Sequence, residues 1–245
     1  MRKMKKLLSL LLIAALLVSI VPMAAVATPA PEADLFSQIA LLSDDEFEIR
    51  PNPFTDVNPN NWFYDYVRIL YHFDVMTGTT ATTFAPNGTL TRAMVVAILY
   101  RLEYSPTPGC TPAEFSDVPE SAWFAPYVTW AASWGIVEGV GGGRFAPNAS
   151  VTREQFAVML YRFTDGISCA YGIDMSVPAS FTLDQFTDSG QISAWARDAM
   201  RWVAYHEIVT GTTATTITPG GTATRAQCAA MIVRFMLMIA DQLEA

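Results

Sequence analysis

A Thr-Arg pair occurs three times in this sequence, each time directly before a long apolar segment. The pairs are Thr91-Arg92, Thr152-Arg153 and Thr224-Arg225. A threonine at this place predicts a helix N-cap, because its hydroxyl can accept a hydrogen bond from a free N–H of the first turn. Arginine at the first helical position is unfavourable by about 0.3–1 kcal/mol, since it faces the positive end of the helix dipole. A negatively charged ligand or partner held between the guanidinium and the helix N-terminus would explain all three arginines.

The residue three places after each threonine predicts how the helix is capped. Gln155 and Gln227 have the spacing of a capping box, in which the glutamine side chain accepts a hydrogen bond from the backbone of the threonine. Met94 stands at this place in the first copy and cannot do so. We therefore expect a complete capping box in the second and third copies only.

The Thr-Arg pairs belong to a longer internal repeat. Each copy opens with Phe-Thr/Ser-Asp, and a tryptophan and a glycine precede the arginine by 30 and 14 residues. Constant spacing indicates that the intervening loop is a fixed part of each unit, while length varies in the connectors. The repeated residues are Asp56, Trp62, Gly78 and Arg92; Asp117, Trp123, Gly139 and Arg153; Asp188, Trp195, Gly211 and Arg225.

Each unit is predicted to hold two helices. The first begins near Asp65, Pro126 or Asp198, with apolar residues at helical spacing. The second is apolar on nearly all sides for two turns, which is typical of a helix buried on most sides. One such unit cannot cover that surface alone. We therefore expect an all-α, pseudo-threefold bundle of roughly 190 residues, with the second helices in the centre and the first helices and loops outside.

The tryptophans are predicted to be mainly core residues. The repeated tryptophans are interpreted as core anchors rather than as platforms for a sugar, and the others follow the stagger of the first helices. The first group is Trp62, Trp123 and Trp195, and the second is Trp130, Trp134 and Trp202.

Several repeated residues have two open interpretations. The Thr-Arg arginines either contact a ligand or form ion pairs with Asp56, Asp117 or Asp188 that join one repeat to the next, and both roles can hold together. The glycines either provide a turn with positive φ or allow close approach of a sugar. A further arginine lies nine residues after each Thr-Arg arginine, near the expected helix C-terminus, and is interpreted as structural. These further arginines are Arg101, Arg162 and Arg234.

The N-terminus is predicted to be a secretory signal peptide spanning residues 1–27. It has a basic start, an apolar stretch from Leu7 to Val21 and a small-x-small cleavage site at 25–27. The apolar stretch is short for a membrane span, so an uncleaved anchor is the less favoured alternative. Residues 28–53 are polar and proline-bearing and are predicted to be a linker. The linker could contain one short helix near residues 36–42.

Charge excludes one class of partner. Cleavage of the predicted signal peptide removes the four cations at positions 2, 3, 5 and 6, among them every lysine of the chain. The formal net charge then changes from −8 to −12. Such an acidic chain is not expected to bind nucleic acid. Arginine supplies all the remaining positive charge, and its planar fork suits carboxylate or phosphate groups.

Cysteine and histidine give no metal or cofactor signal. Cys228 replaces a core residue of the repeat, while Cys110 and Cys169 lie in connectors and could pair in an oxidising exterior. No CxxC pair is present, and His72 and His206 occupy different repeat positions. We expect no metal and no cofactor.

The repeat resembles S-layer homology domains, in tandem copies over 54–104, 115–165 and 186–240. The matching motifs are the opening Phe-Thr/Ser-Asp, the tryptophan, the apolar-x-Gly, the Phe/Ile-x-Pro and the Thr-Arg. The resemblance implies an exported module of the cell surface that binds a secondary cell-wall polysaccharide, often pyruvylated, in grooves between repeats. It implies ligand-binding roles for Asp56, Gly78 and Arg92, for Asp117, Gly139 and Arg153, and for Asp188, Gly211 and Arg225.

Three departures from the family pattern are present. The motif usually ends in Glu, which this chain lacks at Met94, Gln155 and Gln227. The third copy separates its Asp and Trp by 7 residues instead of 6, so Asp188 is expected to sit differently. Glu138 replaces the threonine of the other copies and would repel an acidic ligand, although Arg144 could offset it. We expect the second groove to differ in affinity or selectivity.

Other functions are weaker interpretations. Glycoside hydrolysis needs two carboxylates flanking one cleft, and the carboxylates here have no pocket-like context. No nucleophile elbow is apparent, so we do not expect an enzyme. The alternatives are direct peptidoglycan binding and an adaptor or self-assembling surface protein that recruits other proteins to the envelope. The adaptor is considered because the sequence shows no separate effector domain. Replacing the three Thr-Arg arginines by alanine is predicted to abolish wall binding and to leave the helical far-UV circular dichroism signal unchanged.

Overall fold

A computed structural model describes residues 50–103 and 115–244. The predicted signal peptide, nearly all of the predicted linker and Cys110 lie outside the described residues, as does the side chain of Cys169. The Cys110–Cys169 pairing therefore stays a prediction.

Six α-helices make up the described part of the chain, which contains isolated β-bridges but no strand. The outer helices are α3 (Tyr64–His72), α5 (Ala125–Ser133) and α7 (Arg197–Tyr205). The inner helices are α4 (Arg92–Leu102), α6 (Arg153–Tyr171) and α8 (Arg225–Glu244). Two 3₁₀ turns precede α7, namely η2 (Ser189–Gln191) and η3 (Ala194–Ala196). The all-α class is confirmed.

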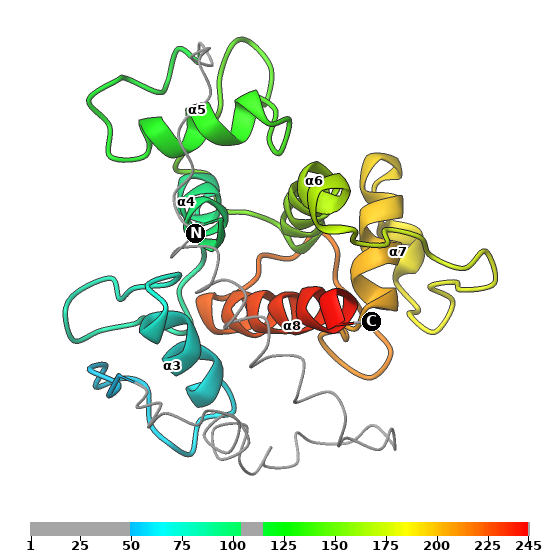
Figure 1. Cartoon of the computed structure of the whole chain (residues 1–245), viewed down its shortest axis with the longest axis horizontal. Helices are drawn as coiled ribbons and strands as arrows, with labels where there is room; N and C mark the ends of the chain where they lie inside the picture. Colours follow the sequence, from blue (N-terminus) through cyan, green and yellow to red (C-terminus); the bar gives the residue numbers. More distant parts are fainter. Residues whose placement is uncertain (1–49, 104–114, 245) are drawn as a thin grey trace.

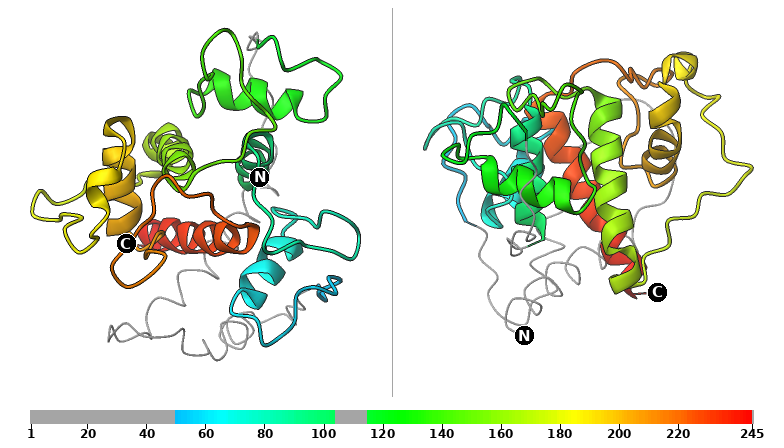
Figure 2. Two further views of the ribbon diagram at one scale, coloured as in Figure 1. Left: turned by 180° about the vertical axis from the view of Figure 1, so that it is seen from behind. Right: turned by 90° about the horizontal axis from the view of Figure 1, so that it is seen from above.

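The inner helices gather in the centre, and the outer helices surround them (Figure 1 and both views of Figure 2). Each outer helix packs on the inner helix of the preceding repeat: α5 on α4 and α7 on α6. The outer helix of the first repeat, α3, packs on α8 of the third repeat. This last contact closes the three repeats into a ring, as the predicted pseudo-threefold bundle requires.

All three inner helices begin at the arginine of the Thr-Arg pair. The Thr152 hydroxyl accepts from the Gln155 N–H, and the Gln155 side chain accepts from the Thr152 N–H, which makes a complete capping box. The third copy repeats it between Thr224 and Gln227. In α4, Thr91 caps the Met94 N–H without a return bond from the Met94 side chain. The predicted difference between the copies is confirmed.

The prediction that the repeated tryptophans are core anchors is wrong. Trp62, Trp123 and Trp195 are 50%, 56% and 59% exposed. The first two stand just before their outer helix begins. Trp62 contacts the rings of Phe63 and Tyr66, Trp123 contacts those of Phe124 and Tyr127, and about half of each side chain stays exposed.

Of the other tryptophans, two match the prediction. Trp130 and Trp202 are fully buried among the largest core side chains. Trp134 is 46% exposed, which contradicts the prediction. It is the C-cap residue of α5, so it lies beyond the last turn to which the helical stagger applies.

Two further features of the described residues bear on function. Cys228 is a free thiol in the core, as predicted, and burial raises its pKa to about 12. None of the helices in ranges 50–103 and 115–244 combines the length and the hydrophobicity needed to cross a bilayer.

Candidate ligand-binding grooves between repeats

Each Thr-Arg arginine joins its own repeat to the next. Arg92 Nε donates to the Phe145 carbonyl oxygen at 2.8 Å, and Arg92 Nη2 donates to the Glu138 carbonyl oxygen at 2.7 Å. The guanidinium also lies 4.6 Å from the centre of the Phe145 ring, within range of a cation–π contact. The arginine of the first repeat therefore clasps the loop of the second.

Arg225 repeats both hydrogen bonds around the ring, and Arg153 repeats the first of them. Arg225 Nε and Nη2 donate to the carbonyl oxygens of Phe84 and Thr77, both at 2.8 Å, which ties the third repeat to the first. Arg153 Nε donates to the Ile217 carbonyl oxygen at 2.9 Å. All three arginines are more than nine-tenths buried. Desolvation lowers the pKa of each, yet arginine stays protonated at neutral pH.

The helix N-termini are not open to an anion. The N–H groups of Arg92 and Ala93 donate to the carbonyl oxygens of Ala149 and Pro147 in the second repeat. The corresponding N–H groups of α6 and α8 donate in the same way to residues 221 and 219 and to residues 88 and 86. The prediction of an anion held against the helix N-terminus is wrong. Arginine stands at the first position because its guanidinium reaches the next repeat.

The three motif aspartates hold the loop that the arginines contact. The two carboxylate oxygens of Asp56 accept from the N–H groups of Phe84 and Ala85, each at 2.8 Å. Ala85 has a φ of 59°, a left-handed conformation that costs an alanine about 1 kcal/mol or more. The carboxylate stabilises this turn, and the turn presents the Phe84 carbonyl to Arg225.

Asp117 and Asp188 make the same pair of bonds in their repeats, to residues 145 and 146 and to residues 217 and 218. Partial burial raises the pKa of both carboxyl groups, but the backbone N–H bonds outweigh it and leave the pKa below its ordinary value. The expectation that Asp188 sits differently is wrong.

The third repeat has one extra residue between Asp188 and Trp195, and the 3₁₀ turns η2 and η3 accommodate it. The buried Glu154 carboxylate accepts there from the Ser193 N–H at 3.0 Å and the Ser193 hydroxyl at 2.9 Å. This contact ties α6 to the third repeat at the point of the insertion.

The proposed ion pairs between the Thr-Arg arginines and these aspartates are not formed. Within residues 50–103 and 115–244 the salt bridges are Arg50–Asp74 and Arg162–Glu138. The arginines bind neutral carbonyl oxygens instead, so their positive charge is not cancelled by a paired carboxylate.

The repeated glycines are required by packing inside each unit. A Cβ on Gly78 would lie 2.5 Å from the Phe54 ring and 2.6 Å from the Thr83 carbonyl oxygen. Gly139 is confined in the same way by Phe115 and Arg144. Positive φ applies to Gly211 alone of the three, with a φ of 105°. The closest neighbours of these glycines are therefore their own Phe ring and loop carbonyls.

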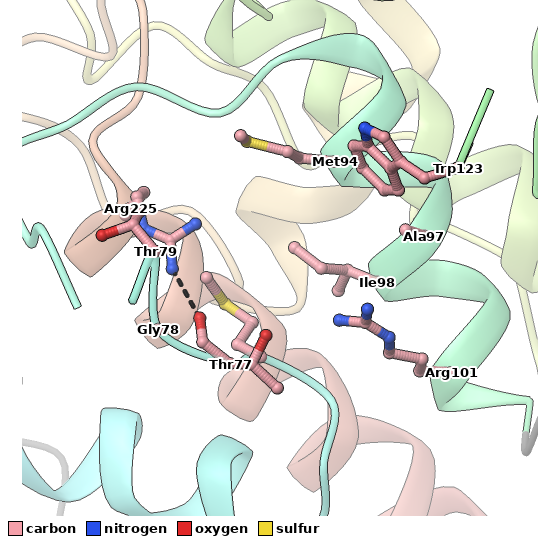
Figure 3. Close-up of a pocket in the computed structure, with 10 residues that line it drawn as sticks. Thr77, Gly78, Thr79, Met94, Ala97, Ile98, Arg101, Trp123 and Arg225 are labelled. Atoms are coloured by element: carbon pink, nitrogen blue, oxygen red, sulfur yellow. Dashed lines mark hydrogen bonds between the residues drawn. The ribbon is translucent and has the colours of Figure 1, made fainter. Parts of the chain in front are cut away.

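Groove 1 is a hollow of about 280 Å³ built from all three repeats. Its walls are the loop Thr77–Thr79, one face of α4 from Met94 to Arg101, Trp123 of the second repeat and Arg225 of the third. Figure 3 shows the guanidinium groups of Arg101 and Arg225 on opposite sides of the hollow, with Trp123 above Ile98.

Groove 3 is a hollow of about 370 Å³ with the same plan. Its walls are the loop 208–212, the face of α8 from Gln227 to Arg234, Trp62 of the first repeat and Arg153 of the second. Arg234 Nη1 donates to the Thr210 hydroxyl at 3.2 Å. Groove 1 and groove 3 are thus built alike: each has its own two arginines, one exposed tryptophan and a threonine-bearing loop.

We call the equivalent place in the second repeat groove 2; the repeat relation puts it at the loop 137–140 and the facing side of α6. Glu138 takes the place of Thr77, and its carboxylate forms an ion pair with Arg162 at 3.1 Å. The partner is Arg162 and not Arg144, which sequence reasoning had suggested. The charge pattern of groove 2 therefore differs from that of the other two grooves.

Sequence reasoning missed the arginines nine residues after the Thr-Arg pairs as groove residues. Arg101 lies in the last turn of α4, as expected, but Arg162 and Arg234 lie in the middle of longer helices. Arg101 and Arg234 line groove 1 and groove 3. The signal in the sequence that could have found them is their fixed spacing of nine residues from the Thr-Arg arginines. The exposed tryptophans have a fixed spacing of the same kind, thirty residues before these arginines.

Comparison with known proteins agrees with this architecture. Residues 53–93, 114–157 and 185–229, just over half of the chain, match the model of the S-layer homology domain. The chain belongs to the S-layer homology domain family. Family membership, together with surface-protein relatives, places it at the cell-envelope surface and gives it a role in attachment to the envelope.

Relatives of two kinds share this region. An endoglucanase of Bacillus sp. (strain KSM-635) is 32% identical over 98% of this chain and 23% of its own length. An amylopullulanase of Thermoanaerobacterium thermosulfurigenes is 32% identical over 80% of this chain and 10% of its own length. An S-layer protein of Bacillus thuringiensis subsp. finitimus is 26% identical over 74% of this chain and 21% of its own length. The chain spans less than a quarter of the length of these relatives.

Proposed function

We propose that the chain attaches to the envelope by binding an acidic cell-wall polysaccharide in groove 1 and groove 3. The observation that carries the proposal is the shared composition of the two grooves. Each has two arginines reaching in from different repeats and one exposed tryptophan from the remaining repeat. Guanidinium groups bind carboxylates with charge-assisted, often paired hydrogen bonds. A sugar bearing a carboxylate, such as a pyruvate ketal, is the ligand that this chemistry favours.

The two arginines of a groove have different tasks. In groove 1, Arg225 uses two of its five N–H donors on loop carbonyls, so its remaining donors and its charge act from a fixed place. Arg101 donates one long bond of 3.4 Å to the Val75 carbonyl and is free to turn toward a ligand. We assign the main carboxylate contact to Arg101 and, in groove 3, to Arg234.

The remaining motif residues would act by shaping the grooves. Asp56 and Asp188 hold the turns that present carbonyls to Arg225 and Arg153. Gly78 and Gly211 allow the loops that form one wall of groove 1 and groove 3. In this proposal the exposed tryptophans give an apolar surface for the sugar ring, which is the usual combination of apolar area and few polar contacts in a small-ligand site.

The experiment is co-sedimentation of the protein with purified wall sacculi, before and after chemical removal of their attached polysaccharide. We expect retention on intact sacculi and loss after removal. Replacing both Trp62 and Trp123 by Ala should abolish retention, whereas Trp134→Ala changes an exposed tryptophan outside the two grooves and should not. Equal retention on both kinds of sacculi would contradict the proposal and favour peptidoglycan or a protein as the partner.

A further inference from the structure

We infer that Glu138 excludes acidic sugars from groove 2, so that the chain has two acid-binding grooves instead of three. The inference rests on the proposed function and concerns which of the three equivalent grooves take part. Glu138 is thereby a specificity-determining residue.

The first support is the ion pair inside groove 2. Glu138 Oε1 lies 3.1 Å from Arg162 Nη2. Arg162 corresponds by its spacing to Arg101 and Arg234, the arginines assigned to the ligand carboxylate in the other grooves. In groove 3 the corresponding contact is between Arg234 and the neutral hydroxyl of Thr210, which leaves the positive charge available. In groove 2 that arginine is already paired with a carboxylate.

The second support is the anchoring of Glu138. Its backbone carbonyl accepts the 2.7 Å bond from Arg92 Nη2, the clasp that joins the first and second repeats. The backbone of Glu138 is therefore held against the groove. An acidic sugar would have to separate the carboxylate from Arg162 and then lie beside it, and like charges brought together at a contact oppose binding strongly.

The third support is the loop itself. Groove 1 and groove 3 have threonines at Thr79 and Thr212, which line the hollows. Val140 takes this place in groove 2, is half exposed and is followed by three glycines. The second loop therefore lacks the side-chain hydroxyls that could hydrogen-bond a sugar in the other two loops.

Each groove has its own reporter, because a different exposed tryptophan belongs to each. Trp123 lines groove 1 and Trp62 lines groove 3. Trp195 has the corresponding place for groove 2 by the repeat relation and is 59% exposed. The indole N–H signals of the ¹⁵N-labelled protein, assigned by single Trp→Phe changes, would follow all three grooves in one titration.

The probe is the methyl glycoside of an N-acetylhexosamine that carries a 4,6-pyruvate ketal, with the same glycoside lacking the ketal as the neutral control. In the wild-type chain we expect saturable shifts of Trp123 and Trp62 with the acidic probe. We expect binding at Trp195 to be at least about tenfold weaker, because of the like charge of Glu138.

Two variants at Glu138 and one matched control complete the test. Glu138→Thr restores the residue of the other grooves, and Glu138→Gln removes the charge at almost constant size. Both should bring the Trp195 response to within about threefold of the other two, since the like-charge penalty is gone. Thr77→Glu, the reciprocal change, should abolish the Trp123 response and leave that of Trp62.

The outcomes separate the inference from the proposed function. If Trp195 responds like the other two in the wild-type chain, the inference is overturned and the proposed function stands. The same holds if Trp195 stays silent in both Glu138 variants while Trp123 and Trp62 respond. If none of the three indoles responds to the acidic probe, the proposed function is overturned and the inference with it.

Discussion

At the scale of single residues, the repeated arginines divide into two sets that differ in their partners. Arg92, Arg153 and Arg225 are buried at the joints between repeats and bond to backbone carbonyls of the next repeat. Arg101 and Arg234 are less buried and line the grooves. The joint arginines should therefore affect folding first, and the groove arginines should affect binding first.

Arg225→Ala should lower the free energy of unfolding by about 2–4 kcal/mol, because it leaves the buried carbonyls of Phe84 and Thr77 without their charged donor. Arg101→Ala removes one long bond to Val75 and should cost less than about 1 kcal/mol. Urea denaturation of the two variants measures both values. Equal stability losses would contradict the division into joint and groove arginines. Alanine at all three Thr-Arg positions is thus a poor test of binding, since it should also weaken the fold.

The lowered pKa values of two motif aspartates predict how the free energy of unfolding changes in acid. The pKa of Asp117 and Asp188 is lowered in the folded state, so their stabilising effect is complete above the unfolded value of about 3.9. It is lost as the pH falls through the lower folded pKa. The free energy of unfolding should therefore fall steeply below about pH 4.

The double variant Asp117→Asn and Asp188→Asn should be less stable at neutral pH and should show a shallower decline in acid. The urea midpoint measured at several pH values checks this. Asp184→Asn, which changes a carboxylate that accepts from the exposed Thr182 hydroxyl, is the control and should keep the wild-type profile. An unchanged acid decline in the double variant would contradict the role of the aspartates.

At the scale of elements, the loop between the outer and inner helix of a repeat is as tightly specified as a helix. Asp56 fixes a left-handed turn at Ala85, and Gly78 lets the loop pass close to the Phe54 ring. These contacts explain why the spacing from glycine to arginine never varies. The same loop forms one wall of groove 1, so its packing decides the shape of that groove.

Gly78→Ala should therefore destabilise the protein by about 2–3 kcal/mol, because the added methyl group has no room beside Phe54 and Thr83. Gly190→Ala is the matched control: a Cβ there meets no atom within 4 Å, and stability should change by less than about 0.5 kcal/mol. Thermal unfolding followed by far-UV circular dichroism compares the two. A Gly78 variant as stable as the Gly190 variant would show that the loop can relax.

Local signals in the sequence predicted the elements well, because capping and apolar spacing act over short distances. Thr152 and Gln155 predicted the start of α6 together with its capping box. Contacts between repeats could not be predicted in this way. The carbonyl partners of Arg92 lie about fifty residues further along the chain, so the sequence offered only the nearest plausible anion, an aspartate.

The tryptophans show the same limit from another side. Trp123 and Trp130 have equal hydrophobicity, but one stands before the first turn of α5 and faces groove 1, while the other lies inside the helix and is buried. Side-chain type alone did not separate these two environments. Position relative to the helix boundary did, and that boundary is the least certain part of a prediction from sequence.

At the scale of the whole molecule, the repeats form a closed ring instead of a row. Each outer helix packs on the inner helix of the preceding repeat, and α3 on α8 completes the circle. The arginine clasps run around the ring in the same order, from the first repeat to the second, the second to the third and the third to the first. No repeat has a complete set of packing partners within itself.

The ring predicts that the three repeats unfold together. Removing residues 186–244 should abolish folding of the whole chain rather than leave two folded repeats, because α3 loses α8 and α6 loses α7. Urea unfolding of the intact chain should give one transition, coincident by tryptophan fluorescence and far-UV circular dichroism. A truncated chain with native-like helix content and a cooperative transition would contradict the closed ring.

In the proposed function, the groove arginines Arg101 and Arg234 bind an acidic component of the wall. This claim is tested most directly by co-sedimentation with intact sacculi of two variants that keep the fold. We expect the double variant Arg101→Ala and Arg234→Ala to lose at least about tenfold in apparent affinity, because the charge-assisted bonds to the ligand are gone. Arg162→Ala, at groove 2, where Arg162 is paired with Glu138, should bind like the wild-type chain. Wild-type binding by the double variant, with its helical signal intact, would contradict the claim.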